Sequence, residues 1–283
     1  MTSPRVNTLA VSTVIFALRP RGDTGATMIG TQLPDTALPD TALPGTQLPG
    51  NQLLWVPLVR RTRDPFLGLW ALPGGWLSAE EELAVAASRT LHETTGLAPK
   101  FLEQLFTFGD LDRSPGDRVV SIVYWALVQS TEADRATVDD NVQWFAADRL
   151  PPLAFDHNRI VEYALWRLRT KMEYSRIAQA FLGTTFTLAQ LREVHEAVLL
   201  RPLDPANFRR SMETSGTLID TGERVAGARH RPPRLYRYSA GTEHPEPSQP
   251  AVRHTIQPPF QPTIQPTIQP SRHEEHAHDD RIR

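Results

Sequence analysis

The chain of 283 residues contains no cysteine. It can therefore form neither structural disulfides nor thiolate zinc sites, and a cysteine nucleophile is excluded as well. The sequence also lacks a run of the roughly 18 apolar residues that a membrane span requires, and its first residues do not have the pattern of a secretory signal. We expect a cytoplasmic protein without a membrane partner.

Charge is distributed unevenly along the chain, although the net charge is only −2. Residues 1–170 carry 15 Lys and Arg against 19 Asp and Glu, whereas residues 171–238 carry 11 against 7. A basic module after an acidic body is typical of a protein whose basic part contacts a polyanion. The length and the globular composition are compatible with two domains.

Two segments have low complexity. Residues 31–50 repeat a five-residue unit with proline at its fourth position, and 241–283 carries three TIQP copies followed by His273, His276 and His278 among acidic residues. Regular proline blocks helix formation, and polar segments cannot offset the entropy lost on ordering. We expect 31–50 to be an extended insertion in a loop and 241–283 to be a disordered tail. A proline-rich ligand and a weak histidine metal site are the less favoured alternatives.

Apolar patterning predicts five strands and several helices. The predicted strands of the first domain are 9–18, 53–61, 101–109, 119–128 and 142–145, and its last helix is 158–171.

Residues 75–97 form a segment of special interest. Ser78 followed by Glu81 has the spacing of a capping box, and Gly96 is a natural terminator, so a helix is predicted at 79–95. The segment resembles the Nudix box. The matching positions are Gly75, Glu81, Arg89, Leu91, Glu93, Gly96 and Leu97. The alternative is a capped surface helix, but the preceding Gly-Gly-Trp and the Arg89 and Glu93 pair favour the Nudix resemblance.

The departures from the Nudix box concern its metal ligands. Nudix hydrolases use carboxylates at the positions of Thr90, Glu93 and Thr94, which share one helical face. Magnesium prefers several oxygen ligands. Each lost carboxylate removes its attraction to the cation, which is roughly 4 kcal/mol for each unit of cation charge at a distance of about 4 Å and an effective dielectric constant of about 20. Glu93, even beside Glu81, should bind Mg²⁺ weakly if at all. Because diphosphate hydrolysis needs a metal to activate water, we expect hydrolysis to be absent or feeble and no cofactor to be required.

The basic module has the pattern of a winged helix-turn-helix. Helices are predicted at 173–182 and 187–199, and a third begins at the cap Asp204 with Pro205 and ends before Gly216. Strands at 218–224 and 235–238 form the wing. In this motif the third helix enters the major groove and the wing contacts the DNA backbone. The candidate DNA contacts are Asn207, Arg209, Arg210, Arg229, Arg231 and Arg234. The alternative is a small helical domain with ordinary solvated arginines.

A degenerate Nudix box followed by a winged helix resembles the NrtR family, Nudix-related regulators of NAD metabolism. The stretches 106–120, 150–157 and 201–210 support this resemblance. It implies an α/β (α+β) Nudix fold with a mixed sheet between helices over 7–150, a connecting helix at 151–171 and a winged helix at 172–238. It further implies a homodimeric repressor that binds a palindromic operator and releases it when the Nudix pocket binds ADP-ribose or a related nucleotide.

The ligand contacts are predicted from side-chain chemistry. Arg113 and Arg118 can pair with a diphosphate, and Phe106, Phe108 or Trp144 can stack on adenine, although alternating aromatics in a strand are also ordinary core residues. The family pattern Asp-Pro-Arg-Gly-Arg is replaced by Ser-Pro-Gly-Asp-Arg at 114–118.

Two alternatives remain open. One is an active Nudix hydrolase such as an ADP-ribose pyrophosphatase, whose mark would be metal-dependent turnover despite Thr90 and Thr94. The other is a nucleotide-binding module without DNA affinity, which would tolerate replacement of Arg209 and Arg210 by Ala.

Overall fold

The computed structural model describes residues 8–20, 52–99, 101–116, 118–136, 140–225 and 232–239. The proline-rich repeat at 31–50, the tail at 241–283, and Arg229 and Arg231 of the wing loop lie outside these ranges.

The first part of the chain forms a mixed β-sheet. Strand β1 (Thr8–Pro20) pairs in parallel with β6 (Val119–Val128) and antiparallel with β2 (Gln52–Arg60). The strand order is β3-β2-β1-β6-β5, with β3 at Trp70–Ala71 and β5 at Phe101–Phe108. Two further strands join it, because β4 (Gly74–Trp76) pairs with β1 and β7 (Val142–Ala146) pairs with β2.

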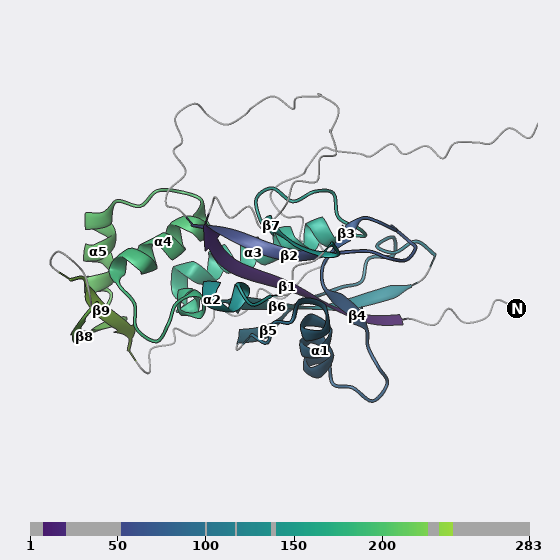
Figure 1. The fold of residues 1–283 in the computed structure, drawn as a ribbon, viewed down its shortest axis with the longest axis horizontal. Coiled ribbons are helices and arrows are strands. Elements are labelled where there is room, and N and C mark those ends of the chain that lie inside the picture. The colour runs from purple at the N-terminus through teal and green to yellow at the C-terminus, as the bar shows by residue number, and fades with distance from the viewer. Residues whose placement is uncertain are drawn as a thin grey trace, which may run out of the picture. The chain divides into compact units, whose positions relative to one another are not determined.

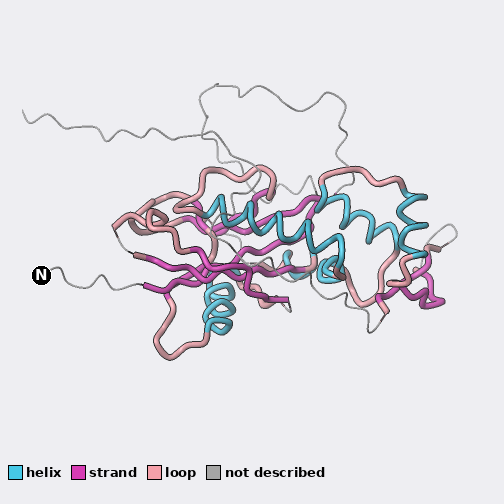
Figure 2. Tube along the Cα trace, turned by 180° about the vertical axis from the view of Figure 1, so that it is seen from behind, coloured by secondary structure: helices cyan, strands magenta, loops and turns pink. Residues whose placement is uncertain are grey.

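Helices cover both faces of this sheet. Helix α1 (Leu83–Thr95) lies on one face and α3 (His157–Tyr174) on the other, and both views show this arrangement (Figures 1 and 2). Since successive strand residues point to opposite faces, Phe16 of β1 packs in the core on the α3 side and Ile15 in the core on the α1 side. A short helix, α2 (Ser130–Ala133), follows β6. None of the described helices is long and apolar enough to cross a membrane.

The start of α1 differs from the prediction. The helix begins at Leu83 after the N-cap Glu82, and no side chain caps it, so the predicted capping box of Ser78 and Glu81 is wrong. Glu81 instead accepts hydrogen bonds from Nε and Nη2 of Arg89 at 2.7 and 2.8 Å. A bidentate charged pair is stronger than a cap bond to one neutral amide. The predicted end is confirmed, because Gly96 has a φ of 71° and its amide donates to the His92 carbonyl.

The second part of the chain is a winged helix. A 3₁₀ helix, η1 (Ile177–Phe181), replaces the predicted helix at 173–182, because α3 itself continues to Tyr174. The next two helices are confirmed: α4 (Leu188–Leu199) begins with the Thr187–Gln190 capping box, and α5 (Pro205–Thr214) is capped by Asp204. Strands β8 (Leu218–Arg224) and β9 (Arg234–Tyr238) form the hairpin of the wing (Figure 1).

The two parts share one hydrophobic core. A single cluster of buried residues includes Phe16 of β1, Leu168 of α3 and Leu191 of α4. Polar contacts reinforce the junction: Arg169 Nε of α3 donates to the Val198 carbonyl of α4 at 3.1 Å, and Gln129 Nε2 donates to the Leu182 carbonyl at 2.6 Å. The winged helix is therefore packed against the Nudix part through α3, in addition to being linked to it by the chain.

The buried His157 and the half-buried His195 make the fold sensitive to acid. Burial, assisted by the nearby Arg113 and Arg61, lowers the pKa of His157 to about 3, and burial lowers the pKa of His195 to about 4. The unfolded chain takes up these protons below about pH 6.5, whereas the folded chain does not until the lowered values are reached. Each histidine should therefore reduce the free energy of unfolding by about 2 kcal/mol at about pH 5 relative to neutral pH.

Urea denaturation at the two pH values measures this loss. The variant His195→Leu should lose only about half as much unfolding free energy between neutral pH and about pH 5 as the wild type. The variant His92→Gln, at an exposed position, should lose as much as the wild type. Equal free energies of unfolding at both pH values in the wild-type protein would contradict the prediction.

Candidate functional site

The acidic face of α1 is organised by Arg89. This guanidinium binds Glu81 through Nε and Nη2 and reaches Glu93 Oε2 through Nη1 at 3.1 Å. The hydrogen bonds from Arg89 hold the pKa of the Glu81 carboxyl below its usual value. Both carboxylates of the Nudix box that remain in this segment are thus engaged by a cation of the protein itself.

The two threonines at metal-ligand positions turn their hydroxyls toward their own helix. Thr90 Oγ1 donates to the Ala86 and Ala87 carbonyls at 2.9 and 3.2 Å, and Thr94 Oγ1 donates to the Thr90 carbonyl. Such bonds to the preceding turn are common for threonine within helices. Thr90 is also buried, with 4% of its surface exposed. These hydroxyls therefore do not replace the missing carboxylates.

The donor set does not fit a divalent cation. Magnesium favours several charged oxygens around one point, but here Glu93 is shared with Arg89. Within the described ranges, no group of three or more His, Cys, Asp or Glu side chains could hold a metal ion.

Two glycines let strand β4 approach β1 and α1 closely. A Cβ atom at Gly74 would lie 2.4 Å from the Val11 carbonyl oxygen, and one at Gly75 would lie 3.1 Å from Cγ2 of Thr90. The Nudix-box glycine thus has a packing role that does not require catalysis.

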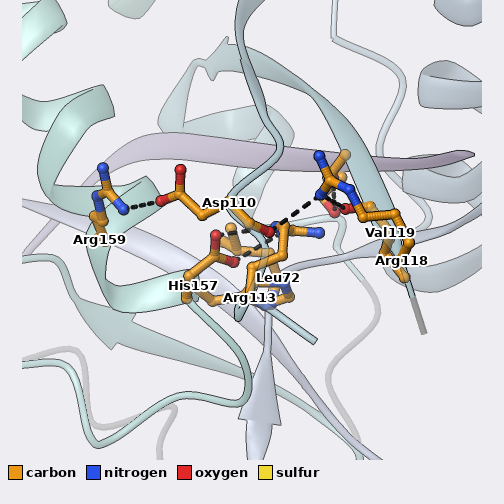
Figure 3. Close-up of polar contacts among 10 residues, drawn as sticks. Leu72, Asp110, Arg113, Arg118, Val119, His157 and Arg159 are labelled. Atoms are coloured by element: carbon orange, nitrogen blue, oxygen red, sulfur yellow. Dashed lines mark hydrogen bonds and ion pairs between the residues drawn. The ribbon is translucent and has the colours of Figure 1, made fainter. Parts of the chain in front are cut away.

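The described residues of the loop at 109–118, which are 109–116 and Arg118, are tied to the first turns of α3, as Figure 3 shows. Arg113 makes a bidentate pair with Asp156, with its Nε at 3.0 Å from Oδ2 and its Nη2 at 2.8 Å from Oδ1. Arg159 forms an ion pair with Asp110, and Arg118 Nη1 donates to the Asp110 carbonyl at 3.2 Å. Three arginines therefore hold this loop in place.

The same end of α3 contacts the strand that leads to the Nudix box. Nδ1 of His157 accepts a hydrogen bond from the Leu72 amide at 2.9 Å (Figure 3), so this imidazole is neutral. The Ala154 amide donates to the Trp70 carbonyl at 2.8 Å, and the Arg61 guanidinium stacks over the Phe155 ring at 4.6 Å. The start of α3 is thus a junction between the loop at 109–118 and the segment before Gly74.

The predicted ligand residues are not gathered at one site. Arg113 is buried, and its guanidinium is bound by Asp156, so its position indicates a structural role. Trp144 is buried in the core on the α1 side of the sheet. Phe106 packs on the α3 side, 5.3 Å from the ring of Tyr163. Phe106 and Trp144 therefore cannot stack on the same adenine, whereas Arg118 remains partly exposed.

Sequence reasoning missed the residues that hold this junction. Asp110, Asp156 and His157 lie in the stretches that carry the NrtR resemblance, which was a usable signal. Arg159 lies just beyond the second stretch and had no such signal. Their partners are 43 to 85 positions away along the chain. Helix and strand periodicity relates only residues that are a few positions apart, so it cannot predict such pairs.

The candidate DNA contacts that the structure describes lie where the prediction placed them. Asn207, Arg209 and Arg210 are exposed on α5, whereas Phe208 and Met212 are half-buried against the core. Arg234 stands on the wing, in an ion pair with Asp220 at 2.8 Å.

A buried carboxylate fixes the turn before α5. Glu196 of α4 accepts hydrogen bonds from the Leu203 amide at 2.9 Å and from Arg192 Nη1 at 2.8 Å. This clamp holds the orientation of the helix that presents Asn207, Arg209 and Arg210.

The buried pair of Arg113 and Asp156 should be a major source of stability for the junction. Replacing Arg113 by Ala leaves a largely buried carboxylate without its partner, which should cost about 3 kcal/mol of unfolding free energy at neutral pH. The control Arg118→Ala, which loses only hydrogen bonds to carbonyl groups, should cost about 1 kcal/mol. Urea denaturation measures both. A loss in Arg113→Ala no larger than that of the control would refute the structural role.

Comparisons with known proteins agree with both parts of the fold. The model of the NUDIX domain family matches residues 49–164, and that of the NrtR DNA-binding winged helix domain matches residues 178–238. An ADP-ribose pyrophosphatase of Methanocaldococcus jannaschii is 36% identical over 111 residues, which is 39% of this chain and 66% of that protein. That match therefore covers less than half of this chain.

Relatives that span both domains are also found. The ADPR responsive transcriptional repressor NtrR of Acinetobacter baylyi is 31% identical over 192 residues, which is 66% of this chain and 76% of that protein. The crystal structure of Shewanella oneidensis NrtR is 33% identical and covers 82% of this chain and 94% of its own, with a TM-score of 0.61. The structure of the same protein complexed with a 27mer DNA is 31% identical to this chain. The match covers 82% of this chain and 93% of that chain, with a TM-score of 0.60. With its Nudix domain, its winged helix and these relatives, the chain belongs to the NrtR family.

Proposed function

We propose that this protein is a transcriptional repressor of NAD metabolism genes, and that its Nudix domain senses ADP-ribose or a related nucleotide. One observation carries the proposal: a winged helix with an exposed basic third helix shares its core with a Nudix domain whose box has lost two metal-binding carboxylates. The repressor of A. baylyi is named as ADPR responsive, and the S. oneidensis protein was crystallised with DNA, which supports both halves of the proposal.

The third helix supplies the side chains for base recognition. Arginine can bind guanine and asparagine can bind adenine through two hydrogen bonds each in the major groove. Asn207, Arg209 and Arg210 lie on the exposed side of α5 and are free of the core. A repressor of this kind acts in the cytoplasm as a homodimer, because two identical recognition helices match the two halves of a palindromic operator.

Helix α3 is the element through which the effector acts. A nucleotide changes DNA affinity only if it binds the DNA-competent and DNA-incompetent states with different affinity. The loop at 109–118 contacts the start of α3 through Arg113, which binds Asp156, and through Asp110, which pairs with Arg159. Arg169 near the end of α3 contacts the last turn of α4. A nucleotide that shifts this loop would therefore displace the helix on which the winged helix packs.

The effector is bound without being hydrolysed in this proposal. The hydroxyls of Thr90 and Thr94 are bonded within α1, and the carboxylate of Glu93 is shared with Arg89. No cofactor is required for DNA binding, and any Mg²⁺ would bind weakly through Glu93. An active hydrolase, the alternative, would need a metal held by other groups.

The DNA interface can be tested by substitution. Wild-type protein should bind the promoter of an NAD biosynthesis operon from its own genome, and ADP-ribose should reverse the binding. Replacing both Arg209 and Arg210 by Ala should weaken binding by roughly tenfold or more, because one good base contact contributes about 1 to 3 kcal/mol and the loss of a second cationic contact adds to this. Electrophoretic mobility shift measures the affinity. The exposed Arg135→Ala on the Nudix domain is the control, and unchanged binding in the double variant would contradict the proposal.

The loss of catalysis can be tested by restoring the carboxylates. The double variant Thr90→Glu, Thr94→Glu should bind Mn²⁺ more tightly than wild type, because each carboxylate adds an attraction of roughly 8 kcal/mol to a divalent ion at about 4 Å before desolvation is subtracted. Isothermal titration measures metal binding, and AMP release measures hydrolysis. The variant Thr90→Gln, Thr94→Gln controls for size. Rapid metal-dependent AMP release by the wild type would show that other residues hold a catalytic metal.

A further inference from the structure

The winged helix contains a groove of about 250 Å³ between α4, α5 and β9. Its apolar lining includes Leu188, Phe208 and Tyr236, and its charged lining consists of Arg192, Arg209 and Arg234. The residues that line it include three guanidinium groups and no carboxylate. The groove therefore combines an apolar surface with concentrated positive charge.

Each of these arginines has a carboxylate partner outside the groove lining. Arg192 pairs with Glu196 at 2.8 Å, Arg209 with Glu213 at 2.9 Å, and Arg234 with Asp220 at 2.8 Å. The first pair is anchored, because only 3% of the Glu196 side chain is exposed. The other two arginine side chains are 58% and 48% exposed, and such exposed pairs contribute little to stability. Arg209 and Arg234 can therefore turn to another anion at small cost.

The guanidinium groups also keep hydrogen-bond donors. The ion pairs use Nη1 of Arg192, Nε of Arg209 and Nη1 of Arg234. Among the described residues, no hydrogen bond occupies the other nitrogens of these three groups. Arginine donors in a planar fork suit the oxygens of a phosphate.

We propose that this groove holds one phosphodiester of the DNA backbone, with its deoxyribose against Phe208; this rests on the proposed DNA binding. The groove is continuous with the DNA-facing side of α5, because Arg209 belongs to both. Free phosphate compounds share this chemistry, but the groove adjoins Asn207 and Arg210, where a duplex would bring its backbone.

Neighbouring side chains then have two different roles in DNA binding. Arg192, Arg209 and Arg234 set the affinity for any DNA sequence, whereas Asn207 and Arg210 read bases. Helix α4, which is neither the third helix nor the wing, thereby contributes a DNA contact through Arg192.

The test measures the binding of the full-length protein to operator and scrambled duplexes by fluorescence anisotropy over a range of KCl concentrations. Loss of one phosphate contact lowers the slope of log affinity against log salt by about 0.9. Arg234→Gln should show this change and should weaken binding to both duplexes by the same factor. Arg237→Gln, at an exposed position that does not line the groove, should leave the slope unchanged.

A second variant avoids any loss of stability. Ala189 lines the groove in the first turn of α4, where an acidic residue favours the helix. Ala189→Asp should therefore keep the fold but repel the phosphate, and it should weaken binding to both duplexes. Gln179→Asp, an equal charge change on η1, should have little effect.

The outcomes separate this inference from the proposed function. Wild-type slopes and affinities in Arg234→Gln and Ala189→Asp would overturn the groove assignment while leaving DNA binding intact. Weakening on the operator alone would assign these side chains to base recognition and overturn it too. Tight binding of inorganic phosphate in the groove, with normal DNA binding by Ala189→Asp, would assign the site to a free phosphate compound. Absence of operator binding by the wild type would overturn the proposed function itself.

Discussion

Helix α3 buries one apolar face, which includes Ile160, Leu168 and Met172, in a core shared by the Nudix sheet and α4. Its first turn is held by the buried pair of Asp156 with Arg113, and its last turns by the pair of Lys171 with Glu103. Because protein cores are close-packed, such a helix cannot shift at one end without repacking along its length. A movement at the Nudix end of α3 is therefore transmitted to the winged helix that packs on the same helix.

The altered Nudix box fits the proposed role of the domain as a sensor. A hydrolase must hold a metal ion and release products. A sensor must keep its ligand intact, so that the occupancy of the binding site reports the concentration of the nucleotide. Thr90 is buried and Thr94 bonds to its own helix, and neither side chain carries a charge on the metal-binding face. The ion pairs of Arg89 with Glu81 and Glu93 then hold the face together without a cation.

Features with local causes could be predicted from the sequence. The strand at 119–128, the capping box of Thr187 and Gln190, and the cap at Asp204 were all confirmed, because each depends on residues within a few positions. The capping box at Ser78 was wrong because α1 begins only at Leu83, and the Glu81 carboxylate binds Arg89, eight positions away. The ligand contacts of Arg113, Arg118, Phe106 and Trp144 stay predictions, but long-range pairing decides where these side chains lie. Arg113 binds Asp156, which is 43 positions away along the chain. The side of the sheet on which Trp144 lies depends on the pairing of β7 with β2.

In this account, ADP-ribose and DNA each weaken the binding of the other to the protein, and the protein does not hydrolyse ADP-ribose. Linkage requires the effect to be reciprocal, so ADP-ribose must bind the operator complex more weakly than the free protein. Isothermal titration of ADP-ribose into both, with recovery of the nucleotide afterwards, measures this directly. The account predicts affinities that differ by about 5-fold to 150-fold and intact ADP-ribose. Equal affinities, or conversion of the nucleotide to AMP, would contradict it.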